Sequence, residues 1–426
     1  MRVAFTTLGC KVNQVETEAM ESLFVKSGYE IVNFTEKADI YVVNTCSVTS
    51  LGEQKSRKLI HRAHRENEKA IIAVVGCYAQ ANGEEIAKIP GVSVVIGAKD
   101  KAKIVEFVED ALKGKFVNAV TDARENTEFE EITSNFSQNR TRAFLKIEDG
   151  CENFCSYCII PYLRGKIKSR TLESIKKEAV SLADKGFLEI VLTGIHLGMY
   201  GKDTGNTLFD AIKEVLCNTD IPRLRLGSLE SVELSENIIE LAAKDGRLAP
   251  HFHLPLQSGS NAVLKAMNRH YTKEEFKKLA YKIIDKLPTA SISTDIIVGF
   301  PNETAELFNE TLDFVKSVPF SRIHIFPYSK RPGTVAANME NCVSETEKKQ
   351  RVKILTELAN KKTREFIGKF IGKELSVLFE TETDGVSNGL TDNYIRVYTK
   401  DKAELNKISR VALEDFYNDG VMGRII

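Results

Sequence analysis

The sequence predicts an α/β protein with three folded parts: a doubly wound parallel sheet, a partial (β/α)6 barrel and a small C-terminal β-barrel. Short, continuous apolar runs alternate with helical patterns through most of the chain, as is typical of parallel strands covered by helices on both faces. A polar stretch interrupts this series once, and after Gly368 the pattern changes to short β-like pieces. The expected boundaries are 1–125 and 142–343 for the two α/β domains and 368–426 for the β-barrel, with a linker at 126–141 and a connecting helix at 344–367.

The bulk composition restricts the kind of protein. The 426 residues suffice for two to four domains with their own cores. The 59 basic and 59 acidic side chains cancel, so the overall charge neither favours nor excludes a nucleic-acid partner. No apolar run approaches the roughly 18 residues of a membrane span, and the N-terminus lacks a signal peptide. We therefore expect a cytoplasmic protein without membrane contact, in which eight cysteines indicate metal binding or catalysis instead of disulfides.

The first domain begins with a strand and then a helix whose apolar stripe ends at Gly28, a favourable residue just past a helix end. A charged helix is expected at 52–68, and shorter helices at 84–89 and 101–112. The strands expected in this domain are residues 2–8, 30–34, 39–44, 70–75 and 92–96.

Three cysteines stand directly after three of these strands: Cys10, Cys46 and Cys77. In open parallel sheets the carboxyl ends of the strands share one edge, where ligand sites form. Gly9 and Gly76 precede two of the cysteines and allow sharp turns there. The pattern predicts that the three thiols converge on one iron–sulfur cluster, with three independent buried cysteines as the alternative.

The second domain carries six strand patterns separated by helical ones, which favours a partial barrel with its chemistry at the carboxyl ends of the strands. His251 and His253 lie at one of these strands and are expected to be structural. Thr272 and Glu275 form a capping box for one helix. The strands are expected at 143–147, 189–193, 223–227, 252–256, 291–298 and 322–326, and the helices at 172–185, 208–216, 236–244, 273–285 and 305–315.

A loop after the first of these strands places Cys151, Cys155 and Cys158 within eight residues. A tetrahedral zinc site needs four ligands, and the next candidate, His196, is nearly forty residues away. A 4Fe-4S cluster can instead take three thiolates and leave one iron free for another ligand. We therefore expect such a cluster here; a zinc loop with a distant ligand and a set of inert thiols are the alternatives.

The last part of the chain begins with a helix capped by Ser344 and Glu347 and continues in β-like pieces at 374–379, 394–397, 405–413 and 420–426. This helix and the helix at 52–68 carry more basic than acidic side chains, so each is either an RNA contact or a solvated face. Residues 366–426 contain eight basic and ten acidic side chains, which makes this segment a weak electrostatic anchor for phosphate.

The cysteine motifs resemble those of one enzyme family. The loop from Cys151 to Cys158, with Tyr157 before the last cysteine, resembles the signature of radical S-adenosylmethionine enzymes, in which the open iron binds S-adenosylmethionine. The segments 7–14, 44–49 and 76–80 resemble the three motifs of the N-terminal domain of methylthiotransferases. The resemblance spans the chain in the family's domain order, including a C-terminal TRAM domain that binds RNA. It implies two 4Fe-4S clusters as cofactors, held by Cys10, Cys46 and Cys77 and by Cys151, Cys155 and Cys158.

The resemblance also implies a reaction. One S-adenosylmethionine yields a 5′-deoxyadenosyl radical and another yields a methyl group, so that a methylthio group replaces the unactivated hydrogen on C2 of an adenosine in tRNA. Residues 11–14 and 141–147 look most like the branch that acts on N6-threonylcarbamoyladenosine next to the anticodon. Isopentenyladenosine in tRNA and an aspartate of a ribosomal protein are alternative substrates. A non-catalytic iron–sulfur protein that binds RNA or senses redox state is the alternative from another class.

Further cofactor-binding residues are implied by the resemblance: Tyr157 of the three-cysteine loop, and Gly194, Glu230, Gln257 and Gly299 of strand-end segments that resemble the family's S-adenosylmethionine contacts. The loop after the last strand carries an aromatic and two cations, which suit base stacking and phosphate binding but are equally typical of a solvated turn; these are Tyr328, Lys330 and Arg331. The expected partners are the anticodon stem-loop of a tRNA, an electron-donor protein and a sulfur donor.

Overall fold

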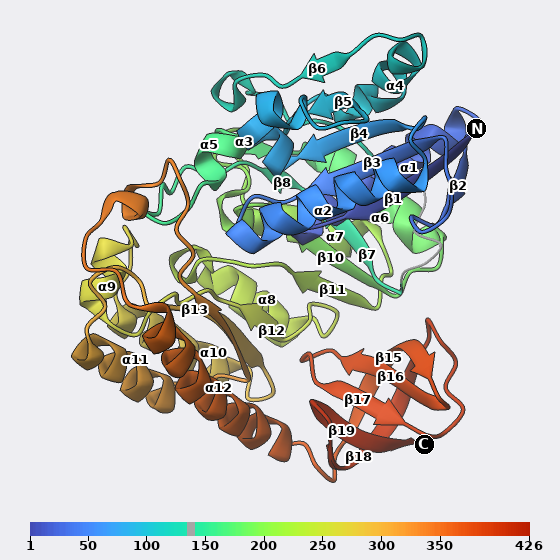
Figure 1. The fold of residues 1–426 in the computed structure, drawn as a ribbon. Helices are drawn as coiled ribbons and strands as arrows, with labels where there is room; N and C mark the ends of the chain where they lie inside the picture. Colours follow the sequence, from blue (N-terminus) through green and yellow to red (C-terminus); the bar gives the residue numbers. More distant parts are fainter. Residues whose placement is uncertain (134–140) are drawn as a thin grey trace.

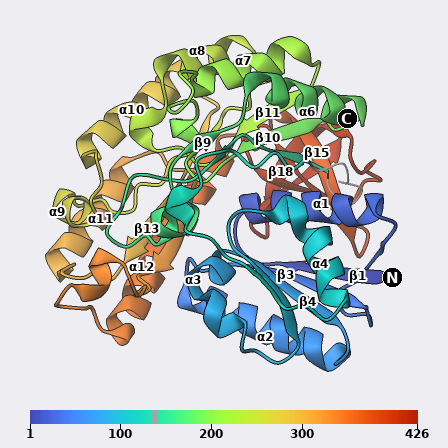
Figure 2. The same cartoon turned by 90° about the horizontal axis from the view of Figure 1, so that it is seen from above.

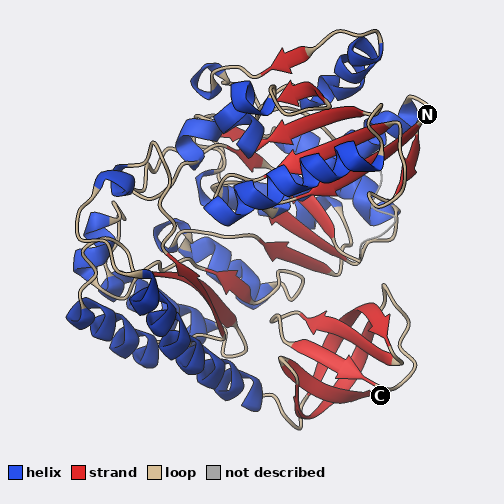
Figure 3. Cartoon of the chain, in the orientation of Figure 1, coloured by secondary structure: helices blue, strands red, loops and turns tan. Residues whose placement is uncertain are grey.

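The computed structural model describes residues 1–133 and 141–426 and contains the three predicted parts (Figure 1). The predicted linker at 126–141 falls partly on residues 134–140, which lie outside the described residues. Helices and strands alternate through the first two parts, whereas strands alone build the last (Figure 3). The predicted fold class is therefore confirmed.

The N-terminal domain is a doubly wound sheet. Its elements are β1 (Arg2–Thr7), α1 (Lys11–Lys26), β2 (Glu30–Val32), β3 (Ile40–Thr45), α2 (Ser50–Glu66), β4 (Ile71–Gly76), α3 (Cys77–Ile86), β5 (Val92–Ile96), α4 (Ile104–Leu112) and β6 (Val117–Ala119). The six strands are parallel, in the order β2-β1-β3-β4-β5-β6. Tyr41 and Val43 pack with α2 and α3, whereas Ile40 and Val42 pack with α1 and α4. Since successive side chains of a strand point to opposite faces, helices cover both faces of the sheet.

The second part is an open barrel of six parallel strands: β7 (Ala143–Lys146), β10 (Glu189–Thr193), β11 (Arg223–Leu226), β12 (His251–His253), β13 (Ser291–Val298) and β14 (Arg322–Pro327). Parallel bridges from Leu224 to Leu248 and from Ser228 to His253 join its two three-stranded halves. The helices are α5 (Ile160–Arg164), α6 (Leu172–Asp184), α7 (Leu208–Asn218), α8 (Glu236–Lys244), α9 (Asn261–Ala266), α10 (Lys273–Lys286) and α11 (Ala305–Ser317). A short antiparallel pair, β8 (Glu148–Asp149) and β9 (Lys168–Ser169), follows β7.

The C-terminal part is a small closed barrel that follows a long helix, α12 (Glu345–Gly368). Its strands are β15 (Glu374–Thr383), β16 (Val386–Thr391), β17 (Arg396–Thr399), β18 (Ile408–Tyr417) and β19 (Gly420–Ile425). They close in the order β15-β16-β17-β19-β18 around buried apolar side chains such as Phe379 and Val397. Full closure leaves no free sheet edge.

The core curves into an arc, and both other parts lie on its open side (Figure 2). Buried ion pairs and hydrogen bonds join them to the core. Glu16 of α1 accepts from Arg164 of α5 at 2.6 Å and from Lys146 of β7 at 3.0 Å. Arg225 of β11 donates to the carbonyl oxygens of Thr391 (3.2 Å) and Asp392 (2.8 Å) in the C-terminal barrel. The three parts therefore pack into one body.

The predicted boundaries differ from the structure mainly at short elements. Helix α3 begins at Cys77 itself, not near Glu84, because Gly76 at φ +93° turns the chain directly from strand into helix. The sequence pattern also misses β6, β16, α5 and α9, which are too short or too polar for a clear periodicity. None of the helices in the described part of the chain combines the length and apolarity that a membrane crossing requires.

Candidate active site

The loop that carries the core cysteine triad (Cys151, Cys155 and Cys158) is fixed by its surroundings. Gly150 precedes it at φ +98°, and a Cβ there would lie 2.0 Å from the carbonyl oxygen of Lys166, so only glycine fits this turn. Within the loop, the backbone N–H of Ser156 donates to the carbonyl oxygen of Met267 at 3.0 Å. The loop follows the carboxyl end of β7 and β8, the end at which barrels of this kind place their chemistry.

Two polar side chains lie against the core triad. His196 Nδ1 is 3.6 Å from Cys151 Sγ, and its Nε2 is 2.5 Å from a carboxylate oxygen of Glu233. Arg269 donates from Nη1 to Cys155 Sγ at 3.1 Å. A guanidinium beside a thiol favours the thiolate, which is the form that binds metal. The sequence indicated His196 only as a distant candidate for a zinc ligand, and no feature of the sequence indicated Arg269.

The N-terminal cysteine triad (Cys10, Cys46 and Cys77) follows β1, β3 and β4. These strands are neighbours in the sheet and pair in parallel register to their last residues. The three cysteines therefore stand at one edge of the sheet, as the sequence predicts. A Cβ on Gly76 would lie 2.5 Å from Oδ1 of Asn44, so a side chain there would push apart the loops that carry the cysteines.

Arg164 connects the two triads. It ends α5, the helix that begins two residues after Cys158, and its Nε donates to Cys77 Sγ at 3.4 Å. Its Nη1 and Nη2 donate to Glu16 (2.6 Å) and to Asn13 Oδ1 (3.0 Å). The segment after the core triad thus reaches a sulfur atom of the N-terminal triad. No periodicity or motif in the sequence marks this arginine.

The thiols suit iron–sulfur clusters better than single zinc ions. All six are free of disulfides. Tetrahedral zinc with bonds of about 2.3 Å brings thiolates within about 3.8 Å of one another, but among the described residues neither triad has all three sulfurs within 4.8 Å. Burial raises the pKa of Cys46 to about 11 and that of Cys158 to about 12, and neighbouring thiols add to both shifts. Such thiols keep their protons unless a metal displaces them.

A cavity of about 570 Å³, called here the large cavity, is lined by residues of all three parts of the protein. Cys10 and Lys11 line it from the N-terminal domain, Gly194 from the end of β10, and Tyr394 from the C-terminal barrel. Its volume is in the range of ligand and cofactor sites. The large cavity therefore brings one cysteine of the N-terminal triad next to a residue expected to contact S-adenosylmethionine.

A second cavity of about 260 Å³, the small cavity, adjoins Cys158 of the core triad. Asp295 of β13 and Phe326 of β14 line both cavities, so the two adjoin along these strands. Three of the residues expected in the site also line the small cavity: Tyr157, Gln257 and Tyr328.

Two residues expected to bind cofactor lie outside both cavities. Glu230 pairs with Arg269 at 2.8 Å and accepts a hydrogen bond from Asn153, in the core triad's loop, at 2.7 Å. Gly299 packs against Lys348, whose Cγ would lie 2.3 Å from a Cβ at that position. The geometry thus gives Glu230 a place beside the core triad and Gly299 a packing role.

Two residues of the loop after β14 also lie outside the cavities. Lys330 is exposed. Arg331 is buried, forms an ion pair with Glu53 of α2 and donates to Ser47 Oγ at 3.0 Å. These contacts connect the loop to the N-terminal domain, next to Cys46.

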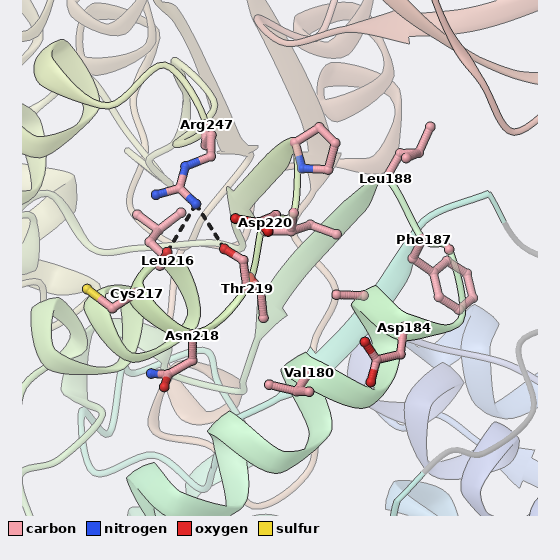
Figure 4. A pocket seen from close by; sticks show the side chains of 14 residues that line it. Val180, Asp184, Phe187, Leu188, Leu216, Cys217, Asn218, Thr219, Asp220 and Arg247 are labelled. Carbon is pink, nitrogen blue, oxygen red and sulfur yellow. Dashed lines mark hydrogen bonds between the residues drawn. The ribbon is translucent and has the colours of Figure 1, made fainter.

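Another hollow, of about 860 Å³, lies at the opposite end of the barrel strands (Figure 4). The segments that lead into β10 and β11 line it together with α6 and α7. On one side Arg247 Nη1 donates to the carbonyl oxygens of Leu216 and Thr219, each at 3.0 Å. Cys217 also lines it, but the six triad cysteines lie elsewhere. The two cavities beside the triads are therefore the candidate active site.

Comparison with known proteins defines the class. Residues 145–315 match the radical SAM superfamily, and residues 2–97 match the uncharacterized protein family UPF0004. The radical S-adenosylmethionine methyltransferase TsrM from Kitasatospora setae has a similar fold, with a TM-score of 0.59 and 14% identity over 79% of this chain and 75% of that chain. The open barrel with its three-cysteine loop is therefore that of a radical S-adenosylmethionine enzyme.

Curated relatives define the family. The chain is 42% identical to the threonylcarbamoyladenosine tRNA methylthiotransferase MtaB of Aquifex aeolicus, over 97% of this chain and 100% of that protein. It is 37% identical to the tRNA-2-methylthio-N(6)-dimethylallyladenosine synthase of Pseudothermotoga lettingae, over 90% of this chain and 88% of that protein. The chain belongs to the radical S-adenosylmethionine methylthiotransferase family, an enzyme family, which confirms the resemblance drawn from the sequence.

Proposed function

We propose that this protein converts N6-threonylcarbamoyladenosine next to the anticodon of tRNA into its 2-methylthio derivative. The observation that carries the proposal is the arrangement of the two triads: Cys10 lines the large cavity, Cys158 lines the small one, and the cavities share Asp295 and Phe326. The higher identity to the threonylcarbamoyladenosine enzyme than to the dimethylallyladenosine enzyme favours the threonylcarbamoyl substrate. Isopentenyladenosine in tRNA is the second candidate.

The two triads would hold the two 4Fe-4S clusters. When bound, the clusters would supply one-electron chemistry and the sulfur, and S-adenosylmethionine would supply the radical and the methyl group. The chain's own part is to hold them in place. Arg269 and Arg164 each donate an N–H to one cysteine sulfur and so stabilise negative charge at the triads. Asn153 and Arg269 fix the carboxylate of Glu230 beside the core triad.

The two cavities would take different ligands. The small cavity, with the rings of Tyr157 and Tyr328 in its walls, suits the adenosyl part of S-adenosylmethionine, since aromatic walls bury a flat apolar group well. The large cavity would then hold the target adenosine. Lys330, exposed on the rim loop, is the group available for an RNA phosphate. In this proposal the N-terminal domain ends near residue 125, the radical S-adenosylmethionine core extends to about residue 343, and the C-terminal barrel binds RNA.

The proposed partners follow from the reaction. The anticodon stem-loop supplies the adenosine, and an electron donor and a sulfur donor must act in each cycle, in the cytoplasm where tRNA is modified. Mass spectrometry of nucleosides from bulk tRNA, with and without this gene, tests the proposal. Loss of the methylthio form with accumulation of threonylcarbamoyladenosine is expected. An unchanged profile would disprove the tRNA substrate.

Two cysteine variants separate the roles of the triads. Cys155→Ala should abolish reductive cleavage of S-adenosylmethionine. Cys46→Ala should still form 5′-deoxyadenosine but should not methylthiolate RNA. Both products are measured by chromatography after reaction with dithionite. Methylthiolation that survives in Cys46→Ala would contradict the role of the N-terminal triad, and absence of 5′-deoxyadenosine from the wild type would favour a non-catalytic protein.

A further inference from the structure

The large cavity has an uneven distribution of charge. Among the described residues, its lining includes two basic side chains, Lys11 and Arg322, and one carboxylate, Asp295, besides three histidines. The Asp295 carboxylate lies 3.3 Å from Nε2 of His253, so it already has a partner within the protein. The cavity therefore offers more positive than negative charge to a ligand.

Lys11 is the basic side chain of this lining that has no ion-pair partner among the described residues. It is the first residue of α1 and directly follows Cys10. Within the part of the chain that the structure describes, its ammonium forms no hydrogen bond or ion pair. Burial lowers the pKa of Lys11, and the charges of Arg142 and Arg225 add to that shift, while Tyr394 and Glu189 oppose it. Arg322, by contrast, pairs with Asp419 at 3.6 Å. An ammonium that faces a cavity without a partner favours a ligand that carries an anion.

The wall beside Lys11 is aromatic. The ring of Tyr394, from the C-terminal barrel, stacks on His251 with centroids 4.3 Å apart and an interplanar angle of 11°. Burial holds the pKa of His251 well below its usual value, and the nearby charges of Arg225 and Lys11 lower it further. His251 is thus neutral at physiological pH and adds no positive charge to this wall.

We propose that Lys11 binds the carboxylate of the threonyl group and so selects threonylcarbamoyladenosine over isopentenyladenosine. This inference rests on the proposed function. The threonylcarbamoyl chain ends in a carboxylate, whereas the isopentenyl chain is uncharged and would bury the ammonium without a partner, a mismatch that binding sites reject strongly. In adenine, C2 and the carbon that bears N6 both flank N1. A ring whose C2 faces Cys10 therefore presents its N6 substituent close by, within reach of the four-carbon stem of Lys11.

The test compares two anticodon stem-loop oligonucleotides. One carries threonylcarbamoyladenosine, and the other carries its carboxamide, which has the same shape but no charge. The reconstituted wild-type enzyme should prefer the carboxylate in kcat/KM and in affinity by roughly 10- to 100-fold, the range for a charge-assisted hydrogen bond. In Lys11→Met this preference should disappear, because kcat/KM and affinity fall for the carboxylate oligonucleotide and hardly change for the carboxamide oligonucleotide. Lys11→Arg should retain it.

Controls keep the outcomes distinct. Lys26→Met, at the exposed far end of α1, should behave as the wild type. Because Lys11 adjoins Cys10, iron content and 5′-deoxyadenosine formation are measured in parallel, and the ratio of the two dissociation constants is measured by fluorescence anisotropy even if iron is lost. A Lys11→Met variant that keeps the full preference in affinity overturns the inference. A wild type that methylthiolates neither oligonucleotide refutes the proposed function instead.

Discussion

Replacing Glu189 by glutamine should loosen the C-terminal barrel from the core. Glu189 begins β10 and is fully buried, and Arg225 and Arg223 pair with it at 2.7 and 3.1 Å. The same two arginines donate to carbonyl oxygens of the C-terminal barrel at residues 390–392. One carboxylate thus neutralises the guanidiniums that dock the barrel, and glutamine would leave them buried without a counter-charge.

The magnitude follows from the pKa of this carboxyl. Burial alone would raise the pKa, but Arg225, followed by Arg223 and Arg142, outweighs burial and lowers it to about 2. A pKa lowered from 4.5 to about 2 corresponds to about 3 kcal/mol of stability, similar to the cost of breaking other buried pairs. Because the folded pKa is depressed, this stability is complete above about pH 4.5 and is lost only as the pH falls toward 2. The effect of Glu189→Gln should therefore be constant between pH 6 and 8.

The assay is urea unfolding followed by circular dichroism. Glu374→Gln is the matched control, since Glu374 pairs with Arg410 at 2.8 Å but both side chains are more than half exposed. Exposed pairs contribute about 0–1 kcal/mol. The free energy of unfolding should fall by about 3 kcal/mol in Glu189→Gln and hardly at all in the control. A Glu189→Gln variant as stable as the control would show that this carboxylate does not hold the barrel on the core.

Two further substitutions test the cysteine triads. Arg164→Met should lower the reduction potential of the N-terminal cluster by on the order of 60 mV, because one charge-assisted hydrogen bond to Cys77 is lost. The potential is measured by a redox titration followed by electron paramagnetic resonance, and an unchanged midpoint potential would contradict this prediction. Gly150→Ala should reduce the iron content of the purified protein by about half, since the added Cβ would meet the Lys166 carbonyl and open the core triad's loop. Gly114→Ala, which has a similar φ but no neighbour within 4 Å, should keep its iron.

The architecture was predictable where the signal is local. Continuous apolar strands between helices indicate a parallel sheet, and residues 92–96 form a strand with the predicted bounds. The edge at which Cys10, Cys46 and Cys77 meet follows from the same rule, because each directly succeeds a strand and all parallel strands end on one side. Capping boxes depend only on residues three apart, and they predicted where α10 and α12 begin. The box of α10 is complete, whereas in α12 only the Ser344 side chain makes its capping hydrogen bond.

Contacts between distant segments could not be predicted in this way. Arg331 was expected to suit a phosphate, yet it pairs with Glu53, 278 residues away in the sequence. His251 and His253 were expected to be structural, and both lie within hydrogen-bond distance of Ser293, but the sequence did not indicate that both also line the large cavity. A single charged or polar residue is not part of a periodic pattern, so the sequence does not indicate which residue of another domain it will contact. The same holds for Arg164 and Arg269, whose importance appears only when a cysteine sulfur lies against them.

The relative position of the two triads is set by a buried charge network, and this has a consequence for the substrate. Arg164 contacts both carboxylate oxygens of Glu16 and also pairs with Asp149, while Lys101 and Lys146 complete the neutralisation of Glu16. The pKa of Glu16 is held below its usual value, because these cations outweigh its burial. Two-point contacts from a planar guanidinium fix orientation as well as distance. A hinge motion between the domains would break several buried pairs, each costing a few kcal/mol, so the adenosine must enter a cavity already formed between triads of fixed separation.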